Sequence, residues 1–201
     1  MPRLEWRTAL KALAGFGVGL AMWIFLTPAY DRVIAGGTQA VMRAFESPKV
    51  TRLRPAEDNF VTVDRADFDP RSKRPGIPIR DLTFNIALLT ALFAASKRTF
   101  SDRNIGGFLV ALVLLAATHV FGAICEVMAI YVAKLGMWST VHYTDFERNV
   151  WGVLNHFYRL VLMYAFAFAL WWVFRDAAAE PSAKKKKRVS ESQSRRVSRK
   201  S

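Results

Sequence analysis

The sequence predicts an all-α integral membrane protein with four transmembrane helices, a small extracytoplasmic helix-plus-hairpin insertion between helices one and two, and a disordered basic C-terminal tail. Apolar residues make up 52% of the 201 residues, yet the net charge is +13. The charges are segregated, because long uncharged blocks alternate with strongly basic ones, as is typical of bilayer-spanning chains. We divide the chain into a first helix (1–30), an extracytoplasmic segment (31–79), a three-helix region (80–176) and the tail (177–201).

The first transmembrane helix is expected from Ala9 to Tyr30, an apolar block interrupted only by Lys11. A block of this length can cross about 30 Å of hydrocarbon. A signal peptide is the competing interpretation, because Arg3 and Arg7 precede the block. The block is longer than a cleavable signal core and lacks a small-x-small exit, so we interpret it as uncleaved.

Three further apolar blocks predict the other helices. Leu82–Ser96 is short, with fifteen residues, unless residues 77–79 extend it. Ile105–Ala133 and Val150–Phe174 exceed the roughly 20 residues that a crossing needs, so we expect them to tilt or to project past the bilayer.

Basic residues predict the orientation of these helices. Arg3, Arg7 and Lys11 flank the first helix, and the connection at 97–104 and the C-terminal segment are also basic. The connection at 136–149 carries one arginine against two acidic residues. The positive-inside rule therefore predicts that both termini and the 97–104 turn face the cytoplasm, which requires an even number of crossings.

The extracytoplasmic segment shows two patterns. Residues 31–46 place apolar side chains at helical intervals, with Gly36–Gly37 as a weak point, and predict an amphipathic helix at the outer membrane boundary. Residues 50–54 and 60–63 flank a five-residue turn and predict a hairpin that leans on the helix or on a partner. Residues 67–78 predict an extended approach to the second helix. A plain spacer loop is the alternative.

Six polar residues fall within the predicted transmembrane helices, where uncompensated ionisable groups are costly. Glu126 and Arg159 lie at matching depths, about 12–15 Å from the outer ends of their helices, so we expect an ion pair. The face that carries Glu126 also carries His119, and Asn155 and Arg159 share a face of the fourth helix. The six residues are Asn85, His119, Glu126, Asn155, His156 and Arg159.

Five of these residues predict an intramembrane polar cluster with a structural or functional role: His119, Glu126, Asn155, His156 and Arg159. The cluster could fix the rotation of the packed helices. A binding or catalytic site is the second interpretation, and hydration near the interface is the third.

No catalytic residue, cofactor or metal site is predicted. The phosphate-binding, dinucleotide-binding, CxxC and HExxH motifs are absent, and the three histidines do not have the spacing of metal ligands. One alternative is a small membrane-embedded enzyme that uses Cys125 with His119 or His156 and Arg159. Another is a carrier or channel subunit that uses Glu126 and Arg159.

The tail lacks large apolar residues except two valines, so it is expected to be disordered. Its basic run favours contact with anionic lipid headgroups, at about 1 kcal/mol per residue near the surface. Nucleic-acid binding is the less favoured interpretation beside a membrane. The residues expected to contact lipid are Lys184, Lys185, Lys186, Lys187 and Arg188.

The layout resembles that of the exosortase H-associated membrane proteins over most of residues 5–176. The similar features are a single N-terminal helix, an external segment of this size, an Asn-bearing second helix (LTFNIALLTALFAA), and a fourth helix that opens VWGVLNHFYRLVL. Exosortases themselves are larger membrane cysteine transpeptidases that use Cys, Arg and His. The context of Cys125, Ala-Ile-Cys-Glu, does not look like their Cys-Ser-Gly signature.

The resemblance implies a non-catalytic accessory to protein sorting in the bacterial inner (cytoplasmic) membrane. Its expected partners are membrane lipids and an exosortase-like membrane protein, without nucleic acid, and the oligomeric state stays open. We expect the partner to contact the hairpin region or a small-residue face formed by Gly15, Gly17, Gly19 and Ala21.

Overall fold

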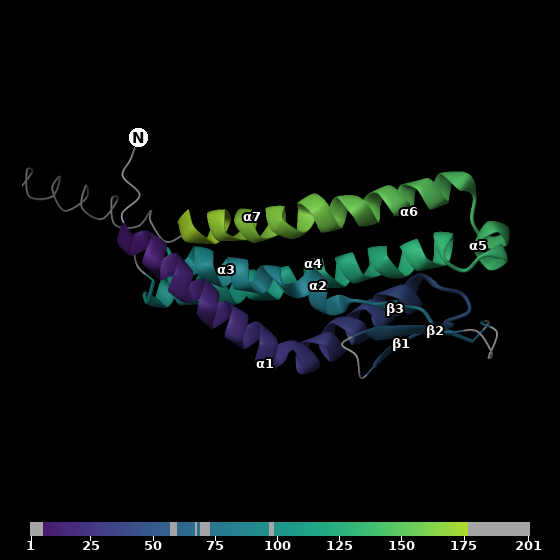
Figure 1. Cartoon of the computed structure of the whole chain (residues 1–201), viewed down its shortest axis with the longest axis horizontal. Helices are drawn as coiled ribbons and strands as arrows, with labels where there is room; N and C mark the ends of the chain where they lie inside the picture. Colours follow the sequence, from purple (N-terminus) through teal and green to yellow (C-terminus); the bar gives the residue numbers. More distant parts are fainter. Residues whose placement is uncertain (1–5, 57–59, 67, 69–72, 97–98, 177–201) are drawn as a thin grey trace, which may run out of the picture.

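The structure, a computed structural model, describes residues 6–56, 60–66, 68, 73–96 and 99–176. It is mostly helical. Long helices lie side by side, and a small sheet packs against one end of them, so the molecule is elongated (Figure 1).

Helix α1 spans Trp6–Phe45 and bends partway along its length (Figure 1). The sequence predicted two separate helices here, and the structure has one. Pro28 lies inside α1, where it removes one backbone hydrogen bond. The helix continues nevertheless, because the residues after Pro28 bury a face against the rest of the protein, with Ile34 and Ala35 at 1% and 2% exposure. The predicted weak point at Gly36–Gly37 does not interrupt it.

The predicted second transmembrane helix is divided at Phe84 into α2 (Ile79–Thr83) and α3 (Asn85–Ala94). Helix α3 packs closely on the first half of α1. A Cβ atom at Gly19 would lie 2.9 Å from the Cα atom of Ala87, and one at Gly15 would collide with Ala94. Small residues let helix backbones approach in this way. We expected Gly15 and Gly19 to face a partner protein. This prediction was wrong, because both residues pack against α3 of the same chain.

Helix α4 spans Asp102–Ala133, and the short helix α5 (Met137–His142) follows it. The next helix is continuous through three parts: α6 (Asp145–Phe157), the π-helical turn η1 (Tyr158–Leu162) and α7 (Met163–Asp176). Thr144 and Glu147 form a capping box at the start of α6, which satisfies two backbone donors.

The predicted hairpin is present. Strands β1 (Thr51–Pro55) and β2 (Val61–Arg65) pair antiparallel, with Leu53 opposite Val63. A third strand, β3 (Gly76–Ile77), pairs with β2 where the sequence predicted only an extended approach. The turn residues 57–59 lie outside the described residues. Apolar side chains of the sheet pack with those of α1 and α4 in one core cluster, so the hairpin leans on the helices.

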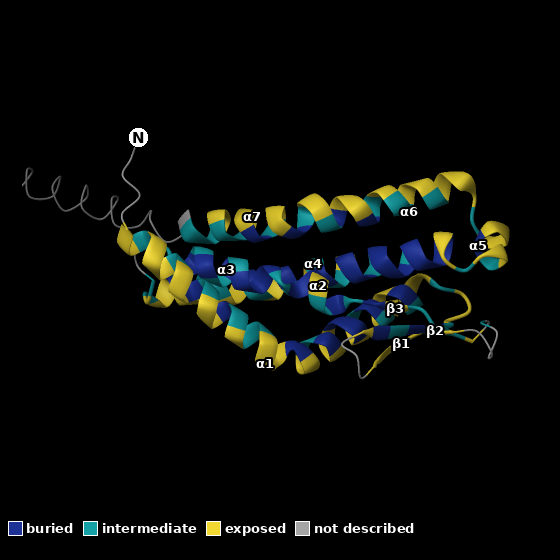
Figure 2. Ribbon diagram, in the orientation of Figure 1, coloured by how far each residue is buried: buried dark blue, intermediate teal, exposed yellow. Residues whose placement is uncertain are grey.

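Two apolar clusters form the core. The first lies at the sheet end and includes Ile34, Val63 and Tyr131. The second lies among the helices at the other end and includes Leu89 and Leu115. Many large apolar side chains remain exposed on the outer sides of α1, α4, α6 and α7, where a lipid-facing surface is expected (Figure 2).

Within the described part of the chain, three helices are long and apolar enough to cross a membrane: Trp6–Phe45, Asp102–Ala133 and Asp145–Arg175. Helices α2 and α3 have only five and ten residues. They are largely buried among the longer helices, with Leu89 and Phe93 at 0% and 3% exposure. The predicted second crossing is therefore not an independent long helix.

Candidate functional site

A chain of hydrogen bonds joins four helices at the buried side chain of His119. Its Nδ1 atom lies 2.8 Å from the hydroxyl of Tyr30 on α1, and its Nε2 atom lies 2.6 Å from Oδ1 of Asn85 on α3. Asn85 then donates its Nδ2 hydrogen to the carbonyl oxygen of Met163 at 2.6 Å. His119 and Asn85 are both fully buried, and the network links α1, α4, α3 and α7.

The hydrogen bonds of Asn85 determine the roles of the imidazole nitrogens. The carbonyl of Met163 is an acceptor, so the Asn85 amide must present Nδ2 to it and Oδ1 to His119. Nε2 of His119 is therefore the donor, and in a neutral ring Nδ1 accepts from the Tyr30 hydroxyl. A neutral imidazole thus has both nitrogens satisfied, as burial requires.

Tyr158 occupies the neighbouring position, at the start of the π-helical turn. It is fully buried, and its hydroxyl donates to the carbonyl of Thr118 at 2.8 Å. The ring lies against Gly122, where a Cβ atom would collide with it. The glycine therefore provides the space for this aromatic contact between η1 and α4.

Glu126 on α4 accepts a hydrogen bond from Nε of Arg159 on η1 in an ion pair. The two partners differ in environment, because the Glu126 side chain is 5% exposed and the Arg159 side chain 40% exposed. Asn155, one turn before Arg159, is buried, and its Oδ1 atom has no hydrogen-bond partner among the described residues.

The predicted cluster is thus divided into parts. Glu126 and Arg159 are together, whereas His119 binds Tyr30 and Asn85 instead of joining them. His156 lies on the exposed side of α6, where its Nδ1 atom contacts the carbonyl of Gly152 in the same helix.

The residues of the cysteine-enzyme alternative do not form a catalytic pair. Cys125 is fully buried. Both ring nitrogens of His119 are engaged with Tyr30 and Asn85, and His156 is exposed. Neither histidine is therefore placed to act as a base for the thiol. Among the residues that the structure describes, no group of three His, Cys, Asp or Glu side chains could hold a metal ion.

A second polar cluster, which the sequence did not reveal, lies at the sheet end. The Arg65 guanidinium lies over the rings of Tyr131 and Trp138, 4.9 and 5.0 Å from their centres. Arg65 also pairs with Glu46 at 3.4 Å, and Glu46 accepts the backbone N–H of Thr51 at 3.0 Å. These contacts attach the sheet to the ends of α1 and α4. In the sequence, Glu46 and Arg65 belong to a segment with many acidic and basic residues, and nothing there distinguishes these two from the others.

The residues expected to contact lipid headgroups, 184–188, lie outside the described part of the chain. Near the end of the last described helix, Arg175 lies over Trp171 and Trp172, 4.2 and 4.5 Å from the ring centres. Cationic and indole side chains grouped in this way are typical of a membrane–water interface.

Comparison with curated proteins and with solved structures gives no significant match. A family model described as exosortase H-associated membrane protein matches residues 3–178. This match covers every helix and strand described above, and it confirms the resemblance seen in the sequence layout. The chain therefore belongs to the family of exosortase H-associated membrane proteins.

Proposed function

We propose that the protein is a non-catalytic accessory protein of the bacterial inner membrane that binds an exosortase through protein–protein contacts and so assists protein sorting. The family description names an association with an exosortase. Three long apolar helices support a multi-pass membrane location.

The observation that carries this proposal is the internal use of the polar groups. Both ring nitrogens of His119 form hydrogen bonds within the chain, and Arg159 forms an ion pair with Glu126. Such contacts fix the helices relative to one another, and they occupy both ring nitrogens of His119 and the carboxylate of Glu126. The outer faces of the long helices are instead apolar, which suits lipid and a membrane partner.

The charged residues support a position for the bilayer. Lys11 and Asp31 are separated by twenty residues of α1, about 30 Å, which matches the hydrocarbon thickness. Sixteen residues separate Arg159 from Arg175, about 24 Å, and arginine side chains can extend to the interface. In this position the Glu126–Arg159 pair lies at the outer boundary rather than deep in hydrocarbon.

The sheet then lies outside the cytoplasm. A sheet with open edges and the exposed charges of Arg52 and Arg54 cannot lie in lipid, because its unpaired backbone groups would have no water. The second half of α1 and the end of α4, which pack with the sheet, project past the membrane with it.

Four crossings with both termini in the cytoplasm follow from this position. In Figure 1 the chain enters α2 from the side of the sheet, and α3 ends at the opposite side of the helix bundle, so α2 and α3 together run through the bilayer. Two such short helices can cross the bilayer because the longer helices around them shield their ends from lipid. The basic residues 184–188 would then face the anionic headgroups of the inner leaflet.

Coexpression with an exosortase tests the proposal. The tagged chain is purified in mild detergent, and the recovered exosortase is compared with that from an unrelated four-helix membrane protein carrying the same tag. We expect recovery at least tenfold above this control. Recovery equal to the control would contradict the proposed function.

A further inference from the structure

The outer side of α6, η1 and α7 is largely exposed (Figure 2), and large apolar side chains follow one another along it. Its side chains are large and about half to three quarters exposed. We define the α6–α7 stripe by Phe146, Val153, Phe157, Leu160, Phe168 and Trp172.

The stripe is longer than the hydrocarbon layer. Twenty-six residues separate Phe146 from Trp172, about 39 Å of helix against about 30 Å of hydrocarbon. Phe146 lies thirteen residues beyond Arg159, about 20 Å past the outer boundary proposed above. Acyl chains end at that boundary, so they cannot cover the α6 part of the stripe.

The other projecting helices are covered differently. The sheet packs on the end of α1, and the last turns of α4 are almost wholly buried, including Val127, Ile130 and Tyr131. On α6, by contrast, Phe146 is 76% exposed and Val153 69% exposed. Val33 and Phe45 on α1 are exposed as well, at 65% and 88%, but the exposed face of α6 continues directly into a helix within the bilayer, α7.

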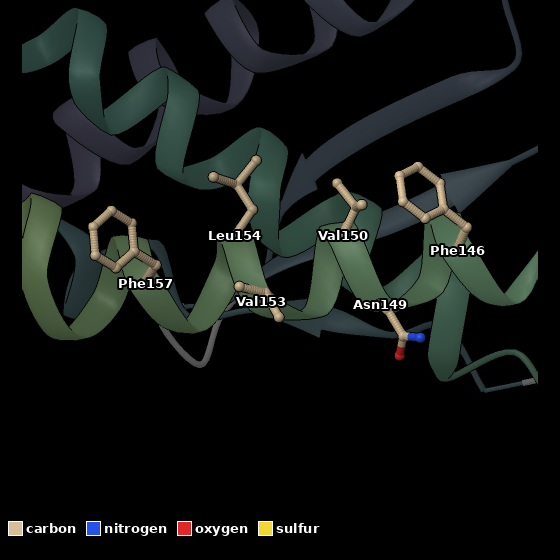
Figure 3. Close-up of a pocket in the computed structure, with 6 residues that line it drawn as sticks. All are labelled: Phe146, Asn149, Val150, Val153, Leu154 and Phe157. Atoms are coloured by element: carbon tan, nitrogen blue, oxygen red, sulfur yellow. The ribbon is translucent and has the colours of Figure 1, made fainter.

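This face has the form of a shallow groove of about 420 Å³. Its lining residues all come from α6, at helical intervals from Phe146 to Phe157, and Asn149 is the one polar residue among them (Figure 3). Within the bilayer the stripe also exposes Ala165 and Ala169, four residues apart. Small residues at this spacing let a second helix approach closely.

We propose that the α6–α7 stripe is the docking surface for a transmembrane helix of the exosortase, which runs along α7 in the bilayer and continues past its outer surface along α6. This inference rests on the proposed function. The continuity of the stripe across the boundary indicates a membrane-spanning helix, because a soluble partner could not reach Ala165 and Ala169. The association named in the family description favours the exosortase over a second copy of the chain.

Site-specific photocrosslinking in cells that coexpress an exosortase tests the surface. A photoreactive phenylalanine replaces Phe146 or Phe168 of the stripe, and Phe45 or Phe25 serves as the matched control on α1. Phe45 and Phe25 are 88% and 81% exposed, so a photoreactive group at the control positions is at least as accessible to a partner as one on the stripe. We expect exosortase adducts from the two stripe positions at least tenfold above those from the controls.

A substitution provides the second measurement. Val153→Asp places a charge in the groove, and Val33→Asp places the same charge on the projecting part of α1, where Val33 is 65% exposed. Val153→Asp is expected to reduce exosortase recovery at least tenfold without lowering the melting temperature, and Val33→Asp to leave recovery unchanged.

The results separate the two proposals. If wild type recovers no exosortase, the proposed function itself fails. If wild type recovers it but the adducts come equally from all four positions, or Val153→Asp recovers it normally, the docking surface is wrong and the function stands. Adducts only with lipid or with a second copy of the chain would likewise overturn the docking surface.

Discussion

Removal of Arg159 should destabilise the protein far more than removal of its partner Glu126. Arg159→Leu leaves the Glu126 carboxylate 5% exposed, without its cation and with little access to water. Breaking a buried pair by removing one partner costs about 3–5 kcal/mol in soluble proteins. Glu126→Gln leaves the Arg159 guanidinium without its anion, but this group is already 40% exposed and can turn to water. This substitution should therefore lower the free energy of unfolding by only about 1 kcal/mol.

The double variant gives the sharper result. Glu126→Gln combined with Arg159→Leu removes both charges, and no uncompensated carboxylate remains. We therefore expect the double variant to be more stable than Arg159→Leu alone, with a coupling free energy of about 2 kcal/mol or more.

The assay is a double-mutant cycle on the purified protein in detergent. Thermal unfolding of wild type, the two single variants and the double variant gives the order of stability, and membrane abundance in cells gives an independent comparison. Additive losses in the double variant would refute the argument, because they would mean that the two side chains do not stabilise each other. Equal losses of stability in Arg159→Leu and Glu126→Gln would refute the prediction that removal of the arginine is the more costly change.

Three further predictions concern packing, topology and the thiol. Gly19→Ala should cost about 1–3 kcal/mol in thermal unfolding, because its Cβ atom would press on α3, whereas Gly17→Ala, which meets no atom within 4 Å, should be close to neutral; equal effects would contradict the α1–α3 contact. A cytoplasm-active reporter should give signal when fused after Ser101 and none after Phe68, and the reverse pattern would overturn the orientation. Cys125→Ala should keep exosortase-dependent sorting within a few-fold of wild type, and loss of sorting at normal membrane abundance would favour the cysteine enzyme.

The long apolar helices could be predicted from the sequence because apolar length is a local property. Each block of about 20 uncharged residues identifies a helix without knowledge of its neighbours. Depth along two antiparallel helices is also nearly local, so counting residues was enough to match Glu126 with Arg159. The hairpin followed from β-branched residues on either side of a turn, again within fifteen residues.

The tertiary structure decided which surfaces and polar groups meet. His119 was expected beside Glu126, but its partners are Tyr30 and Asn85, which lie 89 and 34 residues away in the chain. Contacts over such separations depend on helix rotation, and one residue of a helix turns the face by about 100°. A sequence pattern does not fix that rotation.

The same reasoning applies to the glycines and to α6. Gly15, Gly17 and Gly19 look alike in the sequence, yet two of them pack against α3 and one is open. The apolar face of α6 could equally have been core. The sequence by itself determined that this protein has long apolar helices and a hairpin, because those depend on composition over short ranges. Only the tertiary structure decided which apolar faces the chain covers for itself and which it leaves open, because that depends on how all the helices pack together.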